Sequence, residues 1–295
     1  MAMAETIPFA STKRIHTYHG EADLLELEIK RPFQAIVEPQ AQAKVVLYGR
    51  GEDSHYEFKE AGPYNLKGIA SYEYGYTQVA EARSMKHEGR YFTVATSVLE
   101  GFDILEVFTA DRIVSQISTA HPIDGAVPEV SFIGTRFENL RIAGQKVELE
   151  TNFDILGPRP APDASYFDNQ NVMDRMGLQY KSLSTDPELP DWARERYPRD
   201  KEQWRATDPK VDIARCSLVN RVNGWQKSFG HVIQVPHFGK FFLAELQVKR
   251  ERATKPRDYD TYSINLTMVR MELGSGTTGQ GSGGATGTNG QGSGG

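Results

Sequence analysis

Hydrophobic and polar residues alternate along most of the chain, which is the pattern of β-strands with one buried and one exposed face. In residues 22–30, Leu25, Leu27 and Ile29 have one parity, while Glu26, Glu28 and Lys30 have the other. The segments that we predict as strands are 22–30, 43–47, 71–79, 91–98, 103–119, 129–137, 217–220, 231–235, 240–249 and 261–273. Because strands and helices do not alternate, a parallel α/β enzyme fold is disfavoured. We predict a mainly β fold, an antiparallel β-sandwich or barrel-like sheet pair, with a short helical insertion and a glycine-rich C-terminal tail.

Two local features refine this prediction. Leu140 and Ile142 face Val147 and Leu149 across the turn Ala143-Gly144-Gln145, which predicts a hairpin with glycine at positive φ. In residues 261–273 the hydrophobic parity changes between Met268 and Val269. Such a phase slip exchanges the buried and exposed faces, so we expect a β-bulge or a sharp bend there.

Proline and charge divide the chain into four regions. Residues 1–157 are β-rich, and residues 158–212 form a proline-rich linker followed by a charged, partly helical excursion over the surface. Short helices are expected to begin near Asp186 and Arg199. Residues 213–273 supply strands that complete the same fold, and residues 274–295 form the glycine-rich tail.

The tail has no charged residue, proline, aromatic residue or large aliphatic residue, and half of it is glycine. It cannot bury enough apolar surface to offset the backbone entropy lost on ordering, so we expect a flexible low-complexity segment. The alternative is an assembly or attachment segment whose glycines let neighbouring backbones approach closely. Glycine does not occupy every third position and proline is absent, which excludes a collagen-like repeat.

Composition narrows the class of protein. The net charge is −5, and acidic and basic residues are interspersed, so no nucleic-acid partner is expected. No basic-then-apolar leader and no apolar run of about 20 residues is present, so we expect no membrane span. A cytoplasmic location is the default, with non-classical export left open. The single cysteine, Cys216, cannot form an internal disulfide.

No motif predicts a catalytic centre, a metal site or a cofactor. His16 and His19 have odd spacing in a strand, which places them on opposite faces, and Pro236 separates His231 from His237. Cys216 is expected to be a packed core thiol rather than a nucleophile.

Aromatic residues provide the strongest candidate binding site. Tyr72, Tyr74 and Tyr76 alternate within one predicted strand, so we expect them to share a face. Such a strip can bind a sugar or a peptide, although tyrosines on sheets more often pack across strands.

Two stretches carry a resemblance to known proteins. Residues 97–122 (SVLEGFDILEVFTADRIVSQISTAHP) and 131–147 (SFIGTRFENLRIAGQKV) resemble uncharacterised β-rich bacterial proteins and, more loosely, choice-of-anchor P surface domains. Residues 231–246 and 266–273 are similar to the C-terminal part of the same group. The resemblance implies a β scaffold with no assigned activity, and it assigns no functional residue.

These observations favour a non-catalytic β-scaffold that acts in self-assembly or in binding a surface partner. Sheet edges or the tail would then join copies into a homo-oligomer. The first alternative is a carbohydrate- or peptide-binding module that uses the tyrosine strip. The second is a hydrolase with paired carboxylates, for which Glu26 with Glu28 and Glu148 with Glu150 are the adjacent acids.

Overall fold

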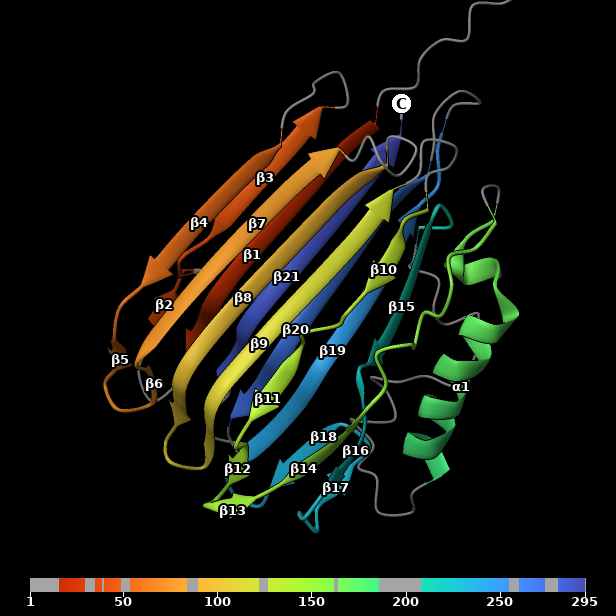
Figure 1. Cartoon of the computed structure of the whole chain (residues 1–295). Coiled ribbons are helices and arrows are strands. Elements are labelled where there is room, and N and C mark those ends of the chain that lie inside the picture. Colours follow the sequence, from red (N-terminus) through yellow and green to blue (C-terminus); the bar gives the residue numbers. More distant parts are fainter. Residues whose placement is uncertain are drawn as a thin grey trace, which may run out of the picture.

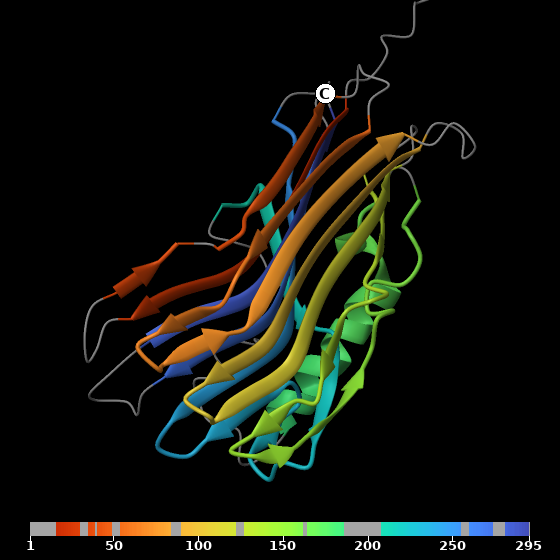
Figure 2. The ribbon, with the colours of Figure 1, turned by 60° about the vertical axis from the view of Figure 1, so that its left-hand side comes forward.

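The long strands of the chain form two antiparallel sheets that lie face to face (Figure 1). The computed structural model describes residues 16–29, 35–38, 40–48, 54–83, 90–121, 127–161, 164–185, 208–254, 260–273 and 281–294. In Figure 2 the long strands of both sheets curve together along the molecule. The prediction of a mainly β, antiparallel sandwich is confirmed.

The first sheet, sheet A, combines both ends of the described chain. Its order is β17 (Ser228–Phe229), β18 (Val232–Val235), β19 (Gly239–Glu251), β20 (Thr261–Leu273), β21 (Gly281–Gly294), β1 (His16–Ile29) and β2 (Ala35–Val37). Two further strands pair beside this path: β15 (Val211–Ser217) with β19, and β3 (Ala43–Tyr48) with β1.

The second sheet, sheet B, is built from the middle of the chain. Its main order is β13 (Gln145–Lys146), β12 (Arg141–Ile142), β9 (Phe108–His121), β8 (Tyr91–Ile104), β6 (Ala70–Tyr72) and β5 (Tyr64–Leu66). β10 (Glu129–Ser131) and β11 (Arg136–Glu138) pair with β9, while β7 (Tyr74–Arg83) joins β8 to β4 (His55–Ala61). A small third sheet pairs β14 (Glu148–Thr151) with β16 (Val219–Asn223).

The core lies between the two sheets. The alternating residues of the long strands turn one face inward, and aromatic rings from both sheets meet there. The ring of Phe108 in sheet B lies 4.7 Å from that of Phe241 in sheet A and 6.0 Å from that of Phe102. All three side chains are at most 1% exposed. Burying each contributes on the order of 1.5–3 kcal/mol of hydrophobic free energy, which holds the sheets together.

The glycine-rich segment is a strand in the middle of sheet A. Residues 281–294 form β21, which is antiparallel to β1 on one side and to β20 on the other. The expectation of a flexible tail is therefore wrong for these residues. The low-complexity argument considers side-chain burial only, whereas β21 pairs its backbone with two neighbours.

Sheet A bends along a line that crosses four neighbouring strands. The pairing between β19 and β20 leaves out Ala244 and Met268, and the pairing between β20 and β21 leaves out Met268 and Thr286. Between β21 and β1 the omitted residues are Thr286 and Leu24. Ala244 has φ 46, and both Met268 and Val269 are buried. The predicted phase slip at Met268 is confirmed, and it belongs to a break in register that spans the sheet.

The predicted hairpin forms with Gly144 at positive φ, but its turn is Ala143-Gly144 without Gln145, and Leu149 belongs to β14, which pairs with β16. Arg141 pairs with Lys146 and Ile142 with Gln145 around a two-residue turn. Both turn residues have positive φ, 47° at Ala143 and 78° at Gly144, as a tight β-hairpin requires.

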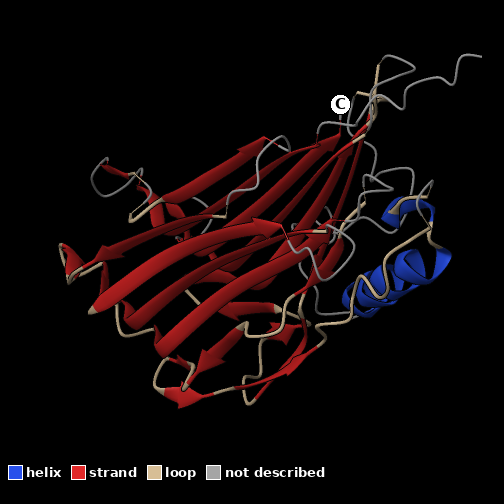
Figure 3. Cartoon of the chain, turned by 45° about the horizontal axis from the view of Figure 1, so that its top comes forward, coloured by secondary structure: helices blue, strands red, loops and turns tan. Residues whose placement is uncertain are grey.

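One α-helix lies along the edge of sheet A beside β15 (Figures 1 and 3). It is α1 (Gln170–Thr185), preceded by the 3₁₀ turn η1 (Tyr166–Asp168). Its buried side chains recur at helical spacing: Val172, Met173, Met176, Tyr180 and Leu183. The expectation of a purely surface excursion is wrong for this helix, since it buries an apolar stripe. The helix starts expected near Asp186 and Arg199 lie outside the described residues. No helix in the described ranges is long and apolar enough to cross a bilayer.

The close approach of the two sheets predicts that a methyl group at Gly75 destabilises the fold. A Cβ there would lie 2.5 Å from Leu24 Cδ1 of sheet A and 3.1 Å from the Val98 carbonyl oxygen. We expect Gly75→Ala to lower the free energy of unfolding by about 1–3 kcal/mol, the usual range for overpacking. Urea denaturation measures this.

Gly62→Ala is the matched control, because nothing lies within 4 Å of a Cβ at that position. It should change the stability by less than about 0.5 kcal/mol, as most surface substitutions do. Equal stability of the two variants would contradict the tight packing of the sheets.

Candidate functional site

The position of β21 defines the first candidate site, a gap between β1 and β20 that a glycine-rich strand fills. Five buried residues of β20, namely Tyr262, Ile264, Leu266, Val269 and Met271, pair with β21. Their partners are Gly292, Gly290, Thr288, Ala285 and Gly283. Positions that would carry large apolar side chains in an ordinary central strand are therefore glycine or small residues.

The opposite sheet explains this choice of residues. β21 lies over β8 and β9 with Cα atoms within 8 Å, closer than the usual separation of about 10 Å between stacked sheets. The buried residues of β8 and β9 include the small Thr93, Ser97, Ser115 and Thr119 alongside the larger Leu99, Ile113 and Ile117. The gap therefore accepts a strand without large side chains and holds it by backbone hydrogen bonds.

The predicted tyrosine strip is divided between the two faces of sheet B. Tyr72 ends β6, is 3% exposed and stacks on Tyr64 with ring centroids 5.7 Å apart. A bend at Glu73 separates β6 from β7 and reverses the parity, so Tyr74 and Tyr76 lie on the outer face. The expectation that the three tyrosines share a face is wrong, because it assumed one uninterrupted strand.

Tyr74 and Tyr76 join a wider aromatic surface instead, which we define as Tyr56, Phe58, Tyr74 and Tyr76. Phe58 of β4 stacks on Tyr76 at 5.7 Å, and the rings of Tyr74 and Tyr76 are 6.3 Å apart. Tyr56 is 64% exposed and Phe58 41%. The Tyr74 hydroxyl donates a hydrogen bond to Glu60 Oε2 at 3.2 Å. This exposed surface thus combines flat apolar rings with a carboxylate.

Sequence reasoning missed Tyr56 and Phe58. They alternate with charged residues in residues 55–61, so a strand signal was present. Their proximity to Tyr76 depends on the pairing of β4 with β7, in which Glu60 lies opposite Tyr76. That register is not visible in either segment alone.

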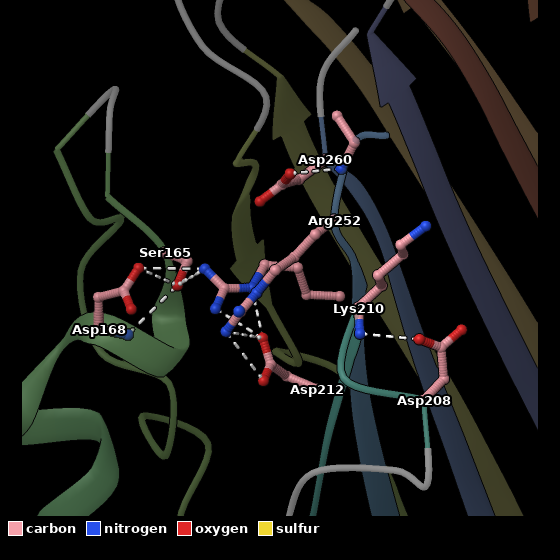
Figure 4. Close-up of polar contacts among 9 residues, drawn as sticks. Ser165, Asp168, Asp208, Lys210, Asp212, Arg252 and Asp260 are labelled. Atoms are coloured by element: carbon pink, nitrogen blue, oxygen red, sulfur yellow. Dashed lines mark hydrogen bonds and ion pairs between the residues drawn. The ribbon is translucent and has the colours of Figure 1, made fainter. Parts of the chain in front are cut away.

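A buried ion network fixes η1 to the edge of sheet A (Figure 4). Arg250 of β19 and Asp212 of β15 are cross-strand partners, and Arg250 Nη2 lies 2.6 Å from Asp212 Oδ2. Arg250 Nη1 also donates to Ser165 Oγ at 2.8 Å and to Asp168 Oδ2 at 3.1 Å. Arg252 makes a second ion pair with Asp212 at 3.0 Å. Because each group has a charged or hydroxyl partner inside the fold, we interpret the network as a structural clamp.

Two carboxyl groups have strongly perturbed pKa values. Burial raises the pKa of Glu81 to about 7. This side chain is 1% exposed, accepts a 3.4 Å hydrogen bond from the Thr93 hydroxyl through Oε1, and has no partner for Oε2 among the described residues. Burial, together with the charges of Glu21 and Glu26, raises the pKa of Asp23 to about 7. Glu81 lies inside the sandwich. Because its pKa is raised, its carboxyl group stays protonated in the folded protein up to about pH 7.

The remaining candidates have structural surroundings. Cys216 is fully buried, and burial raises the pKa of its thiol to about 12, which agrees with a packed core thiol. No group of three metal-ligating side chains occurs in the described ranges. Glu148 and Glu150 are exposed on the same short strand, whereas glycosidase acids face each other across a cleft.

Comparisons with known proteins identify a family. The chain belongs to the family described as Domain of unknown function (DUF8256), whose sequence model matches residues 16–249. The expectation of an uncharacterised family is confirmed, and the looser similarity to choice-of-anchor P domains stays a prediction. No curated protein sequence matches the chain. A solved Pseudomonas aeruginosa FadL homologue aligns over 96% of this chain and 89% of its own, with 8% identity and a TM-score of 0.15. That score supports no inference about fold or function.

The buried carboxyl of Glu81 predicts a stability that falls as pH rises. Its folded-state pKa of about 7 lies above the ordinary value of 4.5. The stabilisation is therefore complete below pH 4.5 and is lost as pH rises through 7. We expect a lower unfolding temperature at pH 8 than at pH 5.5. Glu81→Gln should raise the unfolding temperature at pH 8 by several degrees and reduce this pH dependence.

Calorimetry across that pH range measures the effect. Glu106→Gln, at an exposed turn position, serves as the control and should leave the slope unchanged. Asp23→Asn should reduce the slope further, since the pKa of Asp23 is raised in the same direction. A slope that survives both Glu81→Gln and Asp23→Asn would contradict the assignment.

Proposed function

We propose that this member of the family is a non-catalytic β-scaffold that acts in self-assembly or in binding a surface partner through strand pairing. The observation that carries the proposal is the position of β21, a glycine-rich strand between β1 and β20 that pairs with both. Strand addition of this kind obtains its affinity from main-chain hydrogen bonds and its selectivity from the side chains that fit. Here the selectivity is for small residues.

Exchange between copies follows from the same geometry. A strand that completes a sheet within its own chain makes identical hydrogen bonds when a second copy supplies it, which is the basis of domain swapping. Residues 274–280, between β20 and β21 in the sequence, consist of glycine, serine, threonine and glutamine. The proposal therefore assigns the tail to assembly.

The outer edges of the sandwich are less suited to pairing. Where β3 lies near β4, the Lys44 backbone N–H donates to a Glu57 carboxylate oxygen, and the Thr77 hydroxyl donates to the Ala41 carbonyl. β4 also carries Lys59 and Glu60. Charged side chains on an edge strand oppose further strand addition, which favours the gap filled by β21 over this edge.

A second candidate function is carbohydrate or peptide binding at the aromatic surface. Exposed rings on one sheet face present apolar area to a sugar ring or a peptide side chain. Glu60, next to Tyr74, supplies a hydrogen-bond acceptor at 3.2 Å from its hydroxyl. The hydrolase alternative has less support, because the adjacent acids Glu148 and Glu150 share one strand.

Engineered disulfides test strand exchange. Asn265 of β20 and Asn289 of β21 are direct partners, and such Cα atoms lie about 4.5–5.5 Å apart, within disulfide range. The double variant Asn265→Cys/Asn289→Cys should form an intramolecular bond on oxidation. When the two single variants are mixed and incubated, we expect disulfide-linked dimers on non-reducing gels. The wild-type chain should also elute as a concentration-dependent oligomer.

Ser282→Cys is the matched control, since Ser282 pairs with Glu272 far along β20 from Asn265. Mixing it with Asn265→Cys should give little dimer. The buried Cys216 does not compete. A chain that is monomeric at every concentration and forms only the intramolecular bond would refute assembly through β21.

Substitution of three aromatic residues tests the second candidate. A glycan and peptide array identifies ligands of the wild-type protein. Phe58→Ala/Tyr74→Ala/Tyr76→Ala should then weaken binding by about tenfold or more, as for interface residues that dominate affinity. Leu178→Ala is the control, because Leu178 is 66% exposed on α1. Absence of any ligand for the wild-type protein, or equal affinity of both variants, would remove this candidate.

A further inference from the structure

A pocket of about 550 Å³ opens where the strands β11 and β14 lie against the bend of sheet A. This volume lies within the range of roughly 300–1,000 Å³ typical of small-molecule sites. The pocket is separate from the gap filled by β21 and from the aromatic surface. It uses residues of all three sheets: β11 of sheet B, β14 and β16 of the small sheet, and β19 and β20 of sheet A.

The bend of sheet A contributes part of the pocket wall. Ala244 and Met268, the omitted pair between β19 and β20, both line the pocket. Ala244 has φ 46, and its carbonyl accepts a 3.0 Å hydrogen bond from the Leu218 backbone N–H. This bond joins the bend to the segment that leads into β16. The break in register that the sequence predicts at Met268 is therefore part of a cavity.

The walls of the pocket are largely apolar. Six apolar lining residues are at most 5% exposed: Leu140, Val147, Leu218, Val219, Ala244 and Met268. Phe137 and Leu149 are half-buried, and Phe153 is 37% exposed. Water in such a space makes few hydrogen bonds, so an apolar group that displaces it gains hydrophobic free energy.

Charged groups line the same pocket from exposed positions. Arg136 is already neutralised, because its Nε lies 2.6 Å from Glu138 Oε1 and its Nη1 donates to the Gly134 carbonyl. Lys146 and Glu148 are exposed, and neither forms an ion pair with a described residue. Lys146 is thus the cation of this pocket that is available to a ligand.

We propose that this pocket binds a small amphipathic carboxylate, with its apolar body against Met268, Val147 and Leu149 and its carboxylate paired with Lys146. Glu148 disfavours the anion by charge repulsion, so removing its charge strengthens binding. The site is independent of the function proposed for β21. Both can therefore succeed or fail separately.

Binding of dodecanoate and of dodecanol to the full chain tests the proposal by calorimetry, below the concentration at which either forms aggregates. The wild-type protein should bind dodecanoate, and Lys146→Ala should weaken that binding by about two- to fivefold, the size expected for an exposed ion pair. Glu148→Gln should strengthen it by a similar factor. Neither substitution should alter the affinity for dodecanol.

Two further variants locate the ligand. Leu149→Trp, which adds bulk to a half-buried wall residue, should abolish binding of both ligands while circular dichroism stays unchanged. Lys210→Ala, at an exposed position outside the pocket, should leave both affinities unchanged. If Leu149→Trp proves unfolded, Phe153→Ala replaces it and should weaken both ligands. Failure of the wild-type protein to bind dodecanoate overturns the proposal. Equal effects of Lys146→Ala on acid and alcohol overturn the ligand class.

Discussion

The close approach of the two sheets is the constraint on which the rest of the structure depends. Where β21 crosses β8 and β9, Cα atoms of opposite sheets come within 8 Å, a spacing that the small residues of β21 fit. Small residues lie on both sides of this contact: glycines in β21, and Thr93, Ser97 and Ser115 on the facing strands. Elsewhere, as at Phe108 and Phe241, full-sized rings fill the interior. β1 approaches β7 and β8 within the same distance, so the sheets lie close together along both β21 and its neighbour β1.

The packing of the two sheets also bears on where the pocket and the aromatic surface lie. At Leu24, Met268 and Ala244, the strands of sheet A exchange their buried and exposed faces. The Leu24 side chain packs toward Gly75 of sheet B. On the β19 side of this line, the bend leaves the pocket beneath β11 and β14. On the outer face of sheet B, aromatic residues gather over β4 and β7. The strand β21, the aromatic surface and the pocket thus lie in three separate parts of one sandwich.

Period-two alternation was sufficient to predict the fold class, most long strands, the hairpin at Gly144 and the slip at Met268, because each depends on neighbouring residues. The alternation failed to predict features that depend on residues far apart in the sequence. Tyr72 was assigned to the face of Tyr74 because the bend at Glu73 leaves no mark in the alternation. Tyr56 and Phe58 required the pairing of β4 with β7. The spacing of the apolar residues Val172, Met176, Tyr180 and Leu183 is a helical signal in the sequence. The prediction of a charged surface excursion did not use it. No pattern could have located the pocket, which combines segments far apart in the chain.

The glycine-rich segment shows why a compositional rule can give the wrong structure. Ordering a residue costs about 1–2 kcal/mol of backbone entropy, and more for glycine. A central strand offers each residue up to two backbone hydrogen bonds, each contributing roughly 0.5–1.5 kcal/mol net. These amounts nearly cancel, so β21 adds little net stability beyond satisfying the backbones of β1 and β20. The proposed exchange between copies rests on this balance, because a strand that gains little from pairing within its own chain loses little by pairing with another copy.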